Sequence, residues 1–261
     1  LVENRNAITV AYMTSGNLAV FDHDVRRHLD FLRRLSGERR LGEAAVSQLG
    51  ARVDQFLARK HPGDVDIPEV QDTKRMIRES EAVAGLGTLG LEVGAARFLN
   101  LPFYQTGQVR KDPIGPADVT IVRQLLAEVG PDLIFVAGDL SDPHGTHRMC
   151  KEAIDRALEE HVAAGGRRPE VWLYRGAWQE WPVTEATWLV PLSQEELRLK
   201  IQAIFKHQSQ KDTAPFPGPD DREFWQRVEA RNKGTAAELD RLGLAEYFAM
   251  EAYVVEGYLP G

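Results

Sequence analysis

The sequence predicts an α/β fold with a largely parallel sheet flanked by helices. Two observations carry this prediction. Apolar runs such as 133–137 are uninterrupted, which is typical of parallel strands that are covered on both faces. Between such runs, stretches such as 117–129 place apolar residues three and four positions apart, the spacing of a helix with one buried face. Strands and helices therefore alternate along the chain.

The first half of the chain contains short strand candidates and three helices. The strands are recognised by β-branched and aromatic residues, and the helices by their apolar spacing. Asp72 is placed to cap the third helix, and a glycine-rich stretch after residue 85 ends it. The expected elements, in order, are a strand at 8–13, helices at 24–36, 44–58 and 72–85, and a strand at 96–101.

The second half alternates more regularly. Gly130 and Pro131 end a helix, and Ser193 with Glu196 forms a capping box at the start of another. The expected elements, in order, are a helix at 117–129, a strand at 133–137, a helix that ends near 163, a strand at 170–174, an edge strand at 187–190, helices at 194–207 and 221–242, a short helical piece near Ala245, and a strand at 251–255.

The composition is that of a globular protein and argues against several classes of function. Hydrophobic residues make up 43% of the 261 residues, which is enough for the core of one large domain over 1–261. The formal net charge of -7 argues against non-specific nucleic-acid binding, which needs a basic surface. No apolar run approaches the roughly 20 residues of a membrane span, and no signal peptide is visible. We therefore expect neither nucleic acid nor membrane as a partner.

The chain holds one cysteine, Cys150, so no intrachain disulfide can form, and we expect a reducing, cytoplasmic location. Cys150 is better explained as a small apolar filler than as a nucleophile, because free cysteines are usually buried and inert. The chain begins at Leu1 and runs almost directly into an apolar stretch. We interpret this start as the end of a helix that feeds a strand, and hence the chain as a fragment.

The segment 139–148 is the richest in chemistry-bearing side chains. It follows the strand at 133–137, and ligands of α/β sheets bind beyond the carboxyl ends of strands. His144 and His147 are three residues apart at a helix start, where both share one face, and neutral imidazole suits Zn²⁺. A pair of histidines at this spacing is a weak signal by itself. Asp142 can equally be the N-terminal cap of the helix, with Pro143 in its first turn.

Two further segments carry candidate binding residues. Arg175 and Trp178 follow the strand at 170–174, where an arginine can grip an anionic group and an aromatic ring can stack on a sugar. The alternative is a loop that packs its own tryptophans. His207 lies at the end of the helix at 194–207, where it can also serve only to interact favourably with the helix dipole.

Several of these segments resemble the motifs of PIG-L/LmbE-type zinc-dependent N-deacetylases. Residues 142–148, read Asp-Pro-His-Gly-Thr-His-Arg, resemble the second metal motif of that family. Lys200, Ala203 and the run 207–210 resemble its late Lys…Ala…His-x-Ser-Gln motif. The remaining matches are Thr14-Ser15-Gly16 with the family's Thr-x-Gly, and Arg78 with Glu81 for its Arg…Glu helix. The likeness is strongest to bacterial proteins that fuse a glucosamine-6-phosphate deaminase-like domain to such a domain, and it covers almost the whole chain.

The resemblance implies a Rossmann-like fold whose first strand and helix are missing. Independently of it, the weaker periodicity of about 41–72 indicates a helical insertion there. The resemblance also implies a hydrolytic Zn²⁺ with His147 as a ligand, and His144 as acid or oxyanion partner. Thr146 stands where the family has an aspartate, so that Asp142 or Asp139 would take that role. The family's first metal motif, which supplies two ligands and the base, is absent from this sequence. Gly16, Arg175, Trp178 and His207 are the expected substrate-binding residues.

Three hypotheses follow for the function. The first is an N-deacetylase of an acetylated amino sugar or its phosphate, inactive as a fragment. The second assigns the activity to a fused or associated glucosamine-6-phosphate deaminase-like domain, which this domain assists. The third is a non-catalytic module that binds a sugar.

Overall fold

The computed structural model describes residues 1–40, 42–138, 145–175, 179–210 and 222–257. Helices and strands alternate along them, as the sequence predicts, and the α/β class is confirmed. The strands are β1 (Val10–Tyr12), β2 (Ala96–Phe98), β3 (Leu133–Ala137), β4 (Glu170–Tyr174), β5 (Trp188–Leu192) and β6 (Ala249–Val255). The α-helices are α1 (Asp22–Arg39), α2 (Glu43–Leu57), α3 (Pro68–Thr88), α4 (Pro116–Val129), α5 (Thr146–Ala163), α6 (Gln194–Ile204) and α7 (Phe224–Arg241).

The strands form two sheets within the described residues. β1 pairs with β2 in parallel, and a second sheet has the order β3-β4-β6-β5. In that sheet β3 and β4 are parallel, whereas β6 runs antiparallel to both β4 and β5. The expectation of a largely parallel sheet is therefore met only in part. The apolar run of β3 predicts a strand covered on both faces, but only Val136 is buried and Phe135 is exposed. Strand direction depends on how distant segments meet, which the run does not show.

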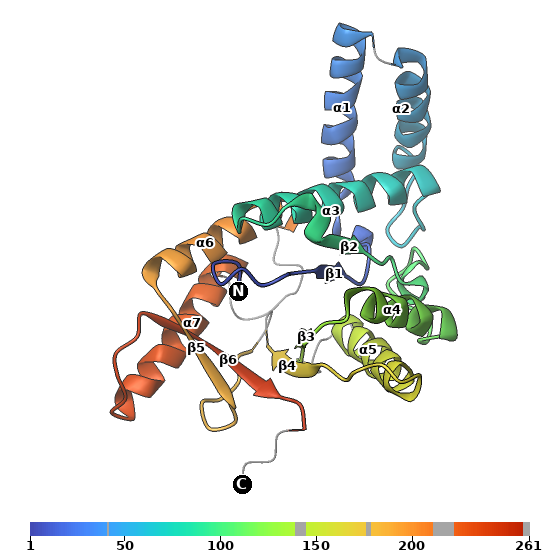
Figure 1. Cartoon of the computed structure of the whole chain (residues 1–261). Coiled ribbons are helices and arrows are strands. Elements are labelled where there is room, and N and C mark those ends of the chain that lie inside the picture. The colour runs from blue at the N-terminus through green and yellow to red at the C-terminus, as the bar shows by residue number, and fades with distance from the viewer. Residues whose placement is uncertain (41, 139–144, 176–178, 211–221, 258–261) are drawn as a thin grey trace.

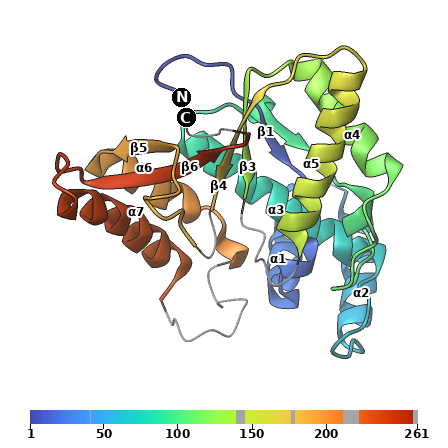
Figure 2. The ribbon, with the colours of Figure 1, turned by 90° about the horizontal axis from the view of Figure 1, so that it is seen from below.

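The sheets and helices form three groups in space. Figure 1 shows α1 and α2 as a helical hairpin that stands away from the body, above α3. On one side of the body α4 and α5 lie together, and β5, β6, α6 and α7 lie on the other, as Figure 2 shows from below. The strands β3 and β4 run between these two groups, so their ends lie where the groups face one another.

Each group has its own hydrophobic core. The largest core lies beneath β3 and β4 and includes the buried residues Phe103, Val119, Val136 and Leu158. A second core holds the helical hairpin to α3, and a third packs α7 on β6. Charges add to the attachment of the hairpin: the buried Lys74 ammonium lies 2.7 Å from an Asp22 carboxylate oxygen and 2.8 Å from one of Asp66.

Some element bounds differ from the sequence prediction for local reasons. The helix expected at 72–85 begins at Pro68, because a proline in the first turn is preorganised for a helix, and Asp72 is not its cap. The helix expected at 194–207 already ends at Ile204. The helical piece expected near Ala245 is wrong, since residues 244–247 are not helical. No helix among the described residues is both long enough and apolar enough to span a membrane.

Candidate functional site

A cavity of about 440 Å³ lies beyond the ends of β3 and β4. Ala137 and Tyr174 end β3 and β4, Arg175 follows β4, and His147 lies in the first turn of α5. Side chains of α6, α7 and β6 close the other side. A cavity therefore lies beyond these strand ends, where the sequence predicts that polar residues gather.

Of the predicted site residues, the structure brings His147 and Arg175 together in this cavity. His144, Asp142 and Trp178 lie outside the described residues. Gly16 and His207 lie around Arg78, in a different set of contacts. The roles given to these residues remain predictions.

The turn at residue 145 sets the position of His147. Gly145 is the N-terminal flanking residue of α5 and has φ of 66°, a left-handed conformation that glycine adopts without strain. The backbone N–H of Met149 donates to the Gly145 carbonyl, which closes the first helical turn. His147 is thereby held in the first turn of α5, at the wall of the cavity.

Arg175 is held by the loop that follows β4. Its guanidinium carbon lies 3.9 Å from the centre of the Trp181 ring, and its Nη1 donates to the Gln179 side chain at 3.2 Å. The Trp181 indole N–H donates to the carbonyl of Leu173 in β4 at 2.9 Å. This tryptophan therefore packs against its own loop, as the structural alternative predicted, and at the same time orients the arginine at the cavity wall.

The cavity also contains Glu180, which the sequence analysis did not single out. Its Oε1 accepts a hydrogen bond from the backbone N–H of Trp181 at 3.1 Å. Burial raises the pKa of Glu180 to about 7, although the nearby charges of Arg231 and Lys200 work in the opposite direction. A carboxyl group with such a pKa exchanges protons near neutral pH, which is the property of a general acid or base.

A fixed ion pair forms the far wall of the cavity. Lys200 of α6 pairs with Glu251 of β6 and also donates to the Asn232 side chain at 3.0 Å. The Tyr253 hydroxyl donates to the other Glu251 oxygen at 2.7 Å. Although burial works to raise it, the pKa of Glu251 is lowered by the charge and hydrogen bond of Lys200. Glu251 is therefore ionised and paired with Lys200, whereas Glu180 has no such ion pair among the described residues.

A second cluster gathers around Arg78 in α3. The Arg78 guanidinium lies 2.8 Å from Glu81, and the Glu81 carboxylate accepts hydrogen bonds from Ser209, from its N–H at 2.6 Å and its hydroxyl at 2.8 Å. Gly16 has φ of 65°, and a Cβ there would lie 3.2 Å from Arg78 Nε. Any side chain at position 16 would thus be strained and would crowd the guanidinium.

His207 belongs to this cluster as a neutral ring. Burial lowers the pKa of His207, the positive charge of Arg78 lowers it further, and Glu81 opposes both. The alternative interpretation, a cation that interacts favourably with the end of a helix, needs a protonated ring and is not favoured. The ring also faces α3, because a Cβ added at Gly85 would lie 3.4 Å from His207 Nε2.

The described residues do not make up a zinc site by themselves. Catalytic zinc usually has three protein ligands, and within the described part of the chain no three His, Cys, Asp or Glu side chains come together as a metal site would need. His147 is the candidate ligand that the structure describes. We therefore derive no chemical step through a metal.

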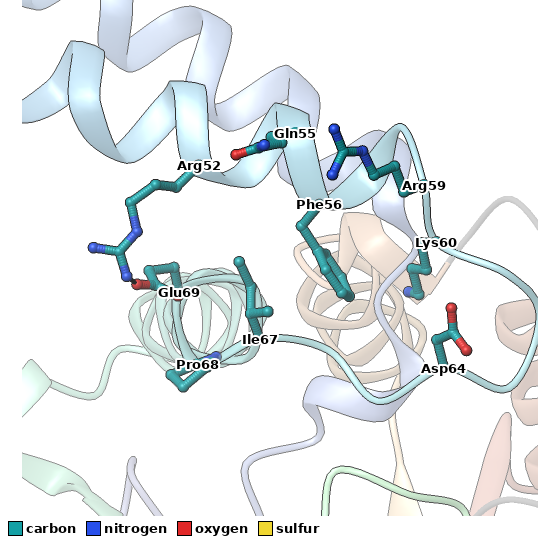
Figure 3. Close-up of a pocket in the computed structure, with 9 residues that line it drawn as sticks. All are labelled: Arg52, Gln55, Phe56, Arg59, Lys60, Asp64, Ile67, Pro68 and Glu69. Atoms are coloured by element: carbon teal, nitrogen blue, oxygen red, sulfur yellow. Dashed lines mark ion pairs between the residues drawn. The ribbon is translucent and has the colours of Figure 1, made fainter.

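A larger pocket, of about 600 Å³, lies at the foot of the helical hairpin, between α2 and the start of α3 (Figure 3). Phe56 and Ile67 form its apolar part, and the ion pair between Arg52 and Glu69 closes one side. This pocket does not include any of the predicted site residues, and it does not adjoin a strand end. We therefore place the candidate site in the cavity beyond β3 and β4.

The chain is 46% identical, over 264 aligned residues, to a glucosamine-6-phosphate deaminase-like protein of Bacteroides thetaiotaomicron. The alignment covers 100% of this chain and 40% of that protein, so the chain spans less than half of the length of its relative. No model of a known protein family matches the chain.

Three solved structures align with this chain at low sequence identity. The 4-carboxy-2-hydroxymuconate hydratase of Pseudomonas putida has a TM-score of 0.50 and 14% identity, with 97% of both chains covered. Two structures of teicoplanin deacetylase, one bound to a ligand and one described as zinc-inhibited, have TM-scores of 0.46 and 0.45 at 15% identity and cover 73% of this chain. These two alignments cover 77% and 78% of the deacetylase chains. The hydratase likeness indicates a shared α/β fold, whereas the two weaker likenesses carry no argument.

Proposed function

We propose that this chain is a hydrolase domain that removes the acetyl group from an N-acetylated amino sugar or from its phosphate. The cavity beyond β3 and β4 carries this proposal, because it combines His147, Arg175 and Glu180 in one space. A sugar phosphate presents hydroxyl groups, an amide and an anion. The cavity offers a guanidinium for the anion and titratable side chains for the amide.

The relative in Bacteroides thetaiotaomicron supports the substrate class, since it is described as like a glucosamine-6-phosphate deaminase. The motif resemblance to PIG-L/LmbE deacetylases supports hydrolysis of the amide. With these supports, we extend the proposal to a fused or associated deaminase-like domain and to a cytoplasmic location. A Zn²⁺ held by His147 together with further ligands, which would activate a water and polarise the carbonyl, remains part of the proposal.

The Rossmann-like order of the sheet is also a proposal. β1 and β3 each have one described neighbour, β2 and β4 respectively. One additional parallel strand between β1 and β3 would join the two sheets into one. Such a strand is what the family resemblance implies, and it would bring the Gly16 and His207 cluster and the His147 cavity to the same sheet edge.

The test is acetate release by the full-length protein from N-acetylglucosamine 6-phosphate and from N-acetylglucosamine, with and without a metal chelator. We expect acetate from at least one of them and a loss of activity with chelator. A second candidate function is a sugar-binding module without catalysis, which is favoured by the lack of a three-residue metal cluster in the described segments. Saturable binding of the sugar phosphate without any acetate release would support that alternative.

A further inference from the structure

Glu180 differs from the other charged residues of the cavity in how it is held. The Trp181 indole anchors the loop to β4, and the Trp181 backbone N–H donates to Glu180 Oε1. Within the described residues, no ion pair joins Glu180 to a lysine or an arginine. Its carboxyl group is therefore fixed in place without being neutralised by a dedicated cation.

The charges that face Glu180 come from several elements. Arg231 of α7 and Lys200 of α6 favour its carboxylate, whereas Glu251 of β6 disfavours it. The effect of Lys200 is reduced because this ammonium already pairs with Glu251. The remaining titratable groups that line the cavity are His147, Tyr174, Arg175 and Tyr253.

We propose that Glu180 is the proton-transfer group of this cavity, which as a carboxylic acid donates its proton to the amine nitrogen that leaves the N-acetyl amino sugar. This inference rests on the proposed function. It requires that the cavity hold a protonated carboxyl at neutral pH, and the raised pKa of Glu180 meets that requirement. Neither Glu251, which is committed to Lys200, nor the cationic Arg175 can supply this proton.

Water adds its oxygen to the amide carbonyl carbon, and a proton of the water passes to the carbonyl oxygen, which gives a neutral intermediate with two hydroxyl groups. The C–N bond then breaks, its electron pair stays on nitrogen, and that nitrogen takes the proton of Glu180. One hydroxyl of the former acetyl group re-forms the carbonyl and returns its proton to the Glu180 carboxylate. The products are the free amine and acetic acid.

The experiment compares the full-length protein with its Glu180→Gln, Glu180→Asp and Glu185→Gln variants. Glutamine keeps the acceptor for the Trp181 N–H but cannot donate a carboxylic proton. Glu185 is an exposed glutamate later in the same connection between strands, so it controls for the loss of a charge. Acetate release from N-acetylglucosamine 6-phosphate is measured against pH.

For the unmodified protein we expect turnover to fall as pH rises above about 7, because Glu180 must be protonated to act. Glu180→Gln should lower turnover roughly 10²–10⁴-fold, which is the usual size of a general acid's contribution. The same substitution should abolish the fall of turnover above about pH 7, the alkaline limb of the pH profile. Glu180→Asp should retain the limb at reduced turnover, and Glu185→Gln should behave as the unmodified protein. Unchanged turnover and pH profile in Glu180→Gln would overturn the inference.

A second readout does not depend on activity. Since the folded-state pKa of Glu180 is raised above the ordinary value of 4.5, its ionisation destabilises the folded state as pH rises through about 7. The melting temperature of the unmodified protein should therefore fall relative to that of Glu180→Gln between about pH 5 and about pH 8. A difference between the two proteins that is the same at both pH values would overturn the inference.

Two remaining outcomes are also decisive. If Glu180→Gln does not fold, the Glu180→Asp profile decides: a folded aspartate variant without the alkaline limb would overturn the inference. If the unmodified protein itself releases no acetate, the proposed function fails and the inference fails with it. That result differs from an active protein that tolerates Glu180→Gln, in which the inference alone fails.

Discussion

Glu81 and Ser209 are 128 residues apart in the sequence, yet both oxygens of the Glu81 carboxylate accept hydrogen bonds from Ser209. This buried pair joins α3 to the turn after α6. Arg78 extends the pair, since it lies 2.8 Å from the same carboxylate and in contact distance of position 16. Three segments far apart in the chain therefore meet at the Arg78–Glu81 pair.

We expect Glu81→Gln to lower the free energy of unfolding by about 1–3 kcal/mol, because an amide N–H₂ would then face donors of Ser209 or Arg78. Urea denaturation measures this change. Glu79→Gln, on the same helix but in a more exposed ion pair with Arg75, is the matched control and should change stability by less than about 0.5 kcal/mol. Equal effects of the two substitutions would contradict the structural role of Glu81.

His207 should make stability depend on pH in one direction. Its folded-state pKa is lowered from 6.5, so the unfolded chain binds the proton more readily. The contribution of His207 is therefore fully present above about pH 6.5 and is lost as pH falls through the lowered pKa. His207→Gln should remove this part of the loss of stability at acid pH, as measured by melting temperature between about pH 7.5 and pH 5.5. An unchanged slope would show that another group is responsible.

Arg175 should select for an anionic sugar. In Arg175→Gln we expect the KM for N-acetylglucosamine 6-phosphate to rise roughly 10- to 100-fold, which corresponds to the loss of one charged hydrogen bond. The KM for unphosphorylated N-acetylglucosamine should change little. Arg198→Gln, an exposed arginine on α6, serves as the control. An equal rise in KM for both sugars would indicate that Arg175 positions the loop and does not bind the phosphate.

The two histidines of segment 144–147 should separate metal binding from turnover in the full-length protein. His147→Ala is expected to remove both bound zinc and acetate release, because a lost ligand removes the activated water as well. His144→Ala should keep zinc and lower turnover roughly 10²–10⁴-fold. Metal analysis and acetate assays are run on the same preparations. Loss of metal in His144→Ala with retention in His147→Ala would reverse the two roles.

The 261-residue chain expressed alone should bind zinc weakly and release negligible acetate. The motif that would supply two of the three usual ligands is absent from its sequence, and the described residues do not form a three-ligand cluster. Metal analysis after dialysis measures the stoichiometry. One tightly bound zinc per chain would contradict the assignment of His147 as its remaining ligand.

The sequence predicted the elements that local patterns determine. The apolar run of β3 and the helical spacing of α4 match their predicted bounds almost to the residue. The direction of β6 was not predictable, because it is set by pairing with β4 and β5 rather than by its own residues. At α3 the local signal was present but was assigned to Asp72 instead of to Pro68.

The candidate site was predictable only where a motif stands beside a strand end. His147 and Arg175 follow β3 and β4, and they do line one cavity. Glu180 was missed because a single glutamate between two other polar or aromatic residues has no distinguishing pattern. Its altered environment arises from α6, α7 and β6, which are separated from it in the sequence and close over it only in the folded chain.

The central place of β6 imposes an order on the assembly of this protein. β6 is the last described strand of the chain, yet it lies between β4 and β5 and contributes Glu251 and Tyr253 to the cavity. Among the described strands, β5 pairs with β6 alone. During synthesis on the ribosome, β4 and β5 must therefore each keep an open edge until β6 emerges. The cavity is thus completed by β6, and a ribosome that stops before residue 249 releases a product without it.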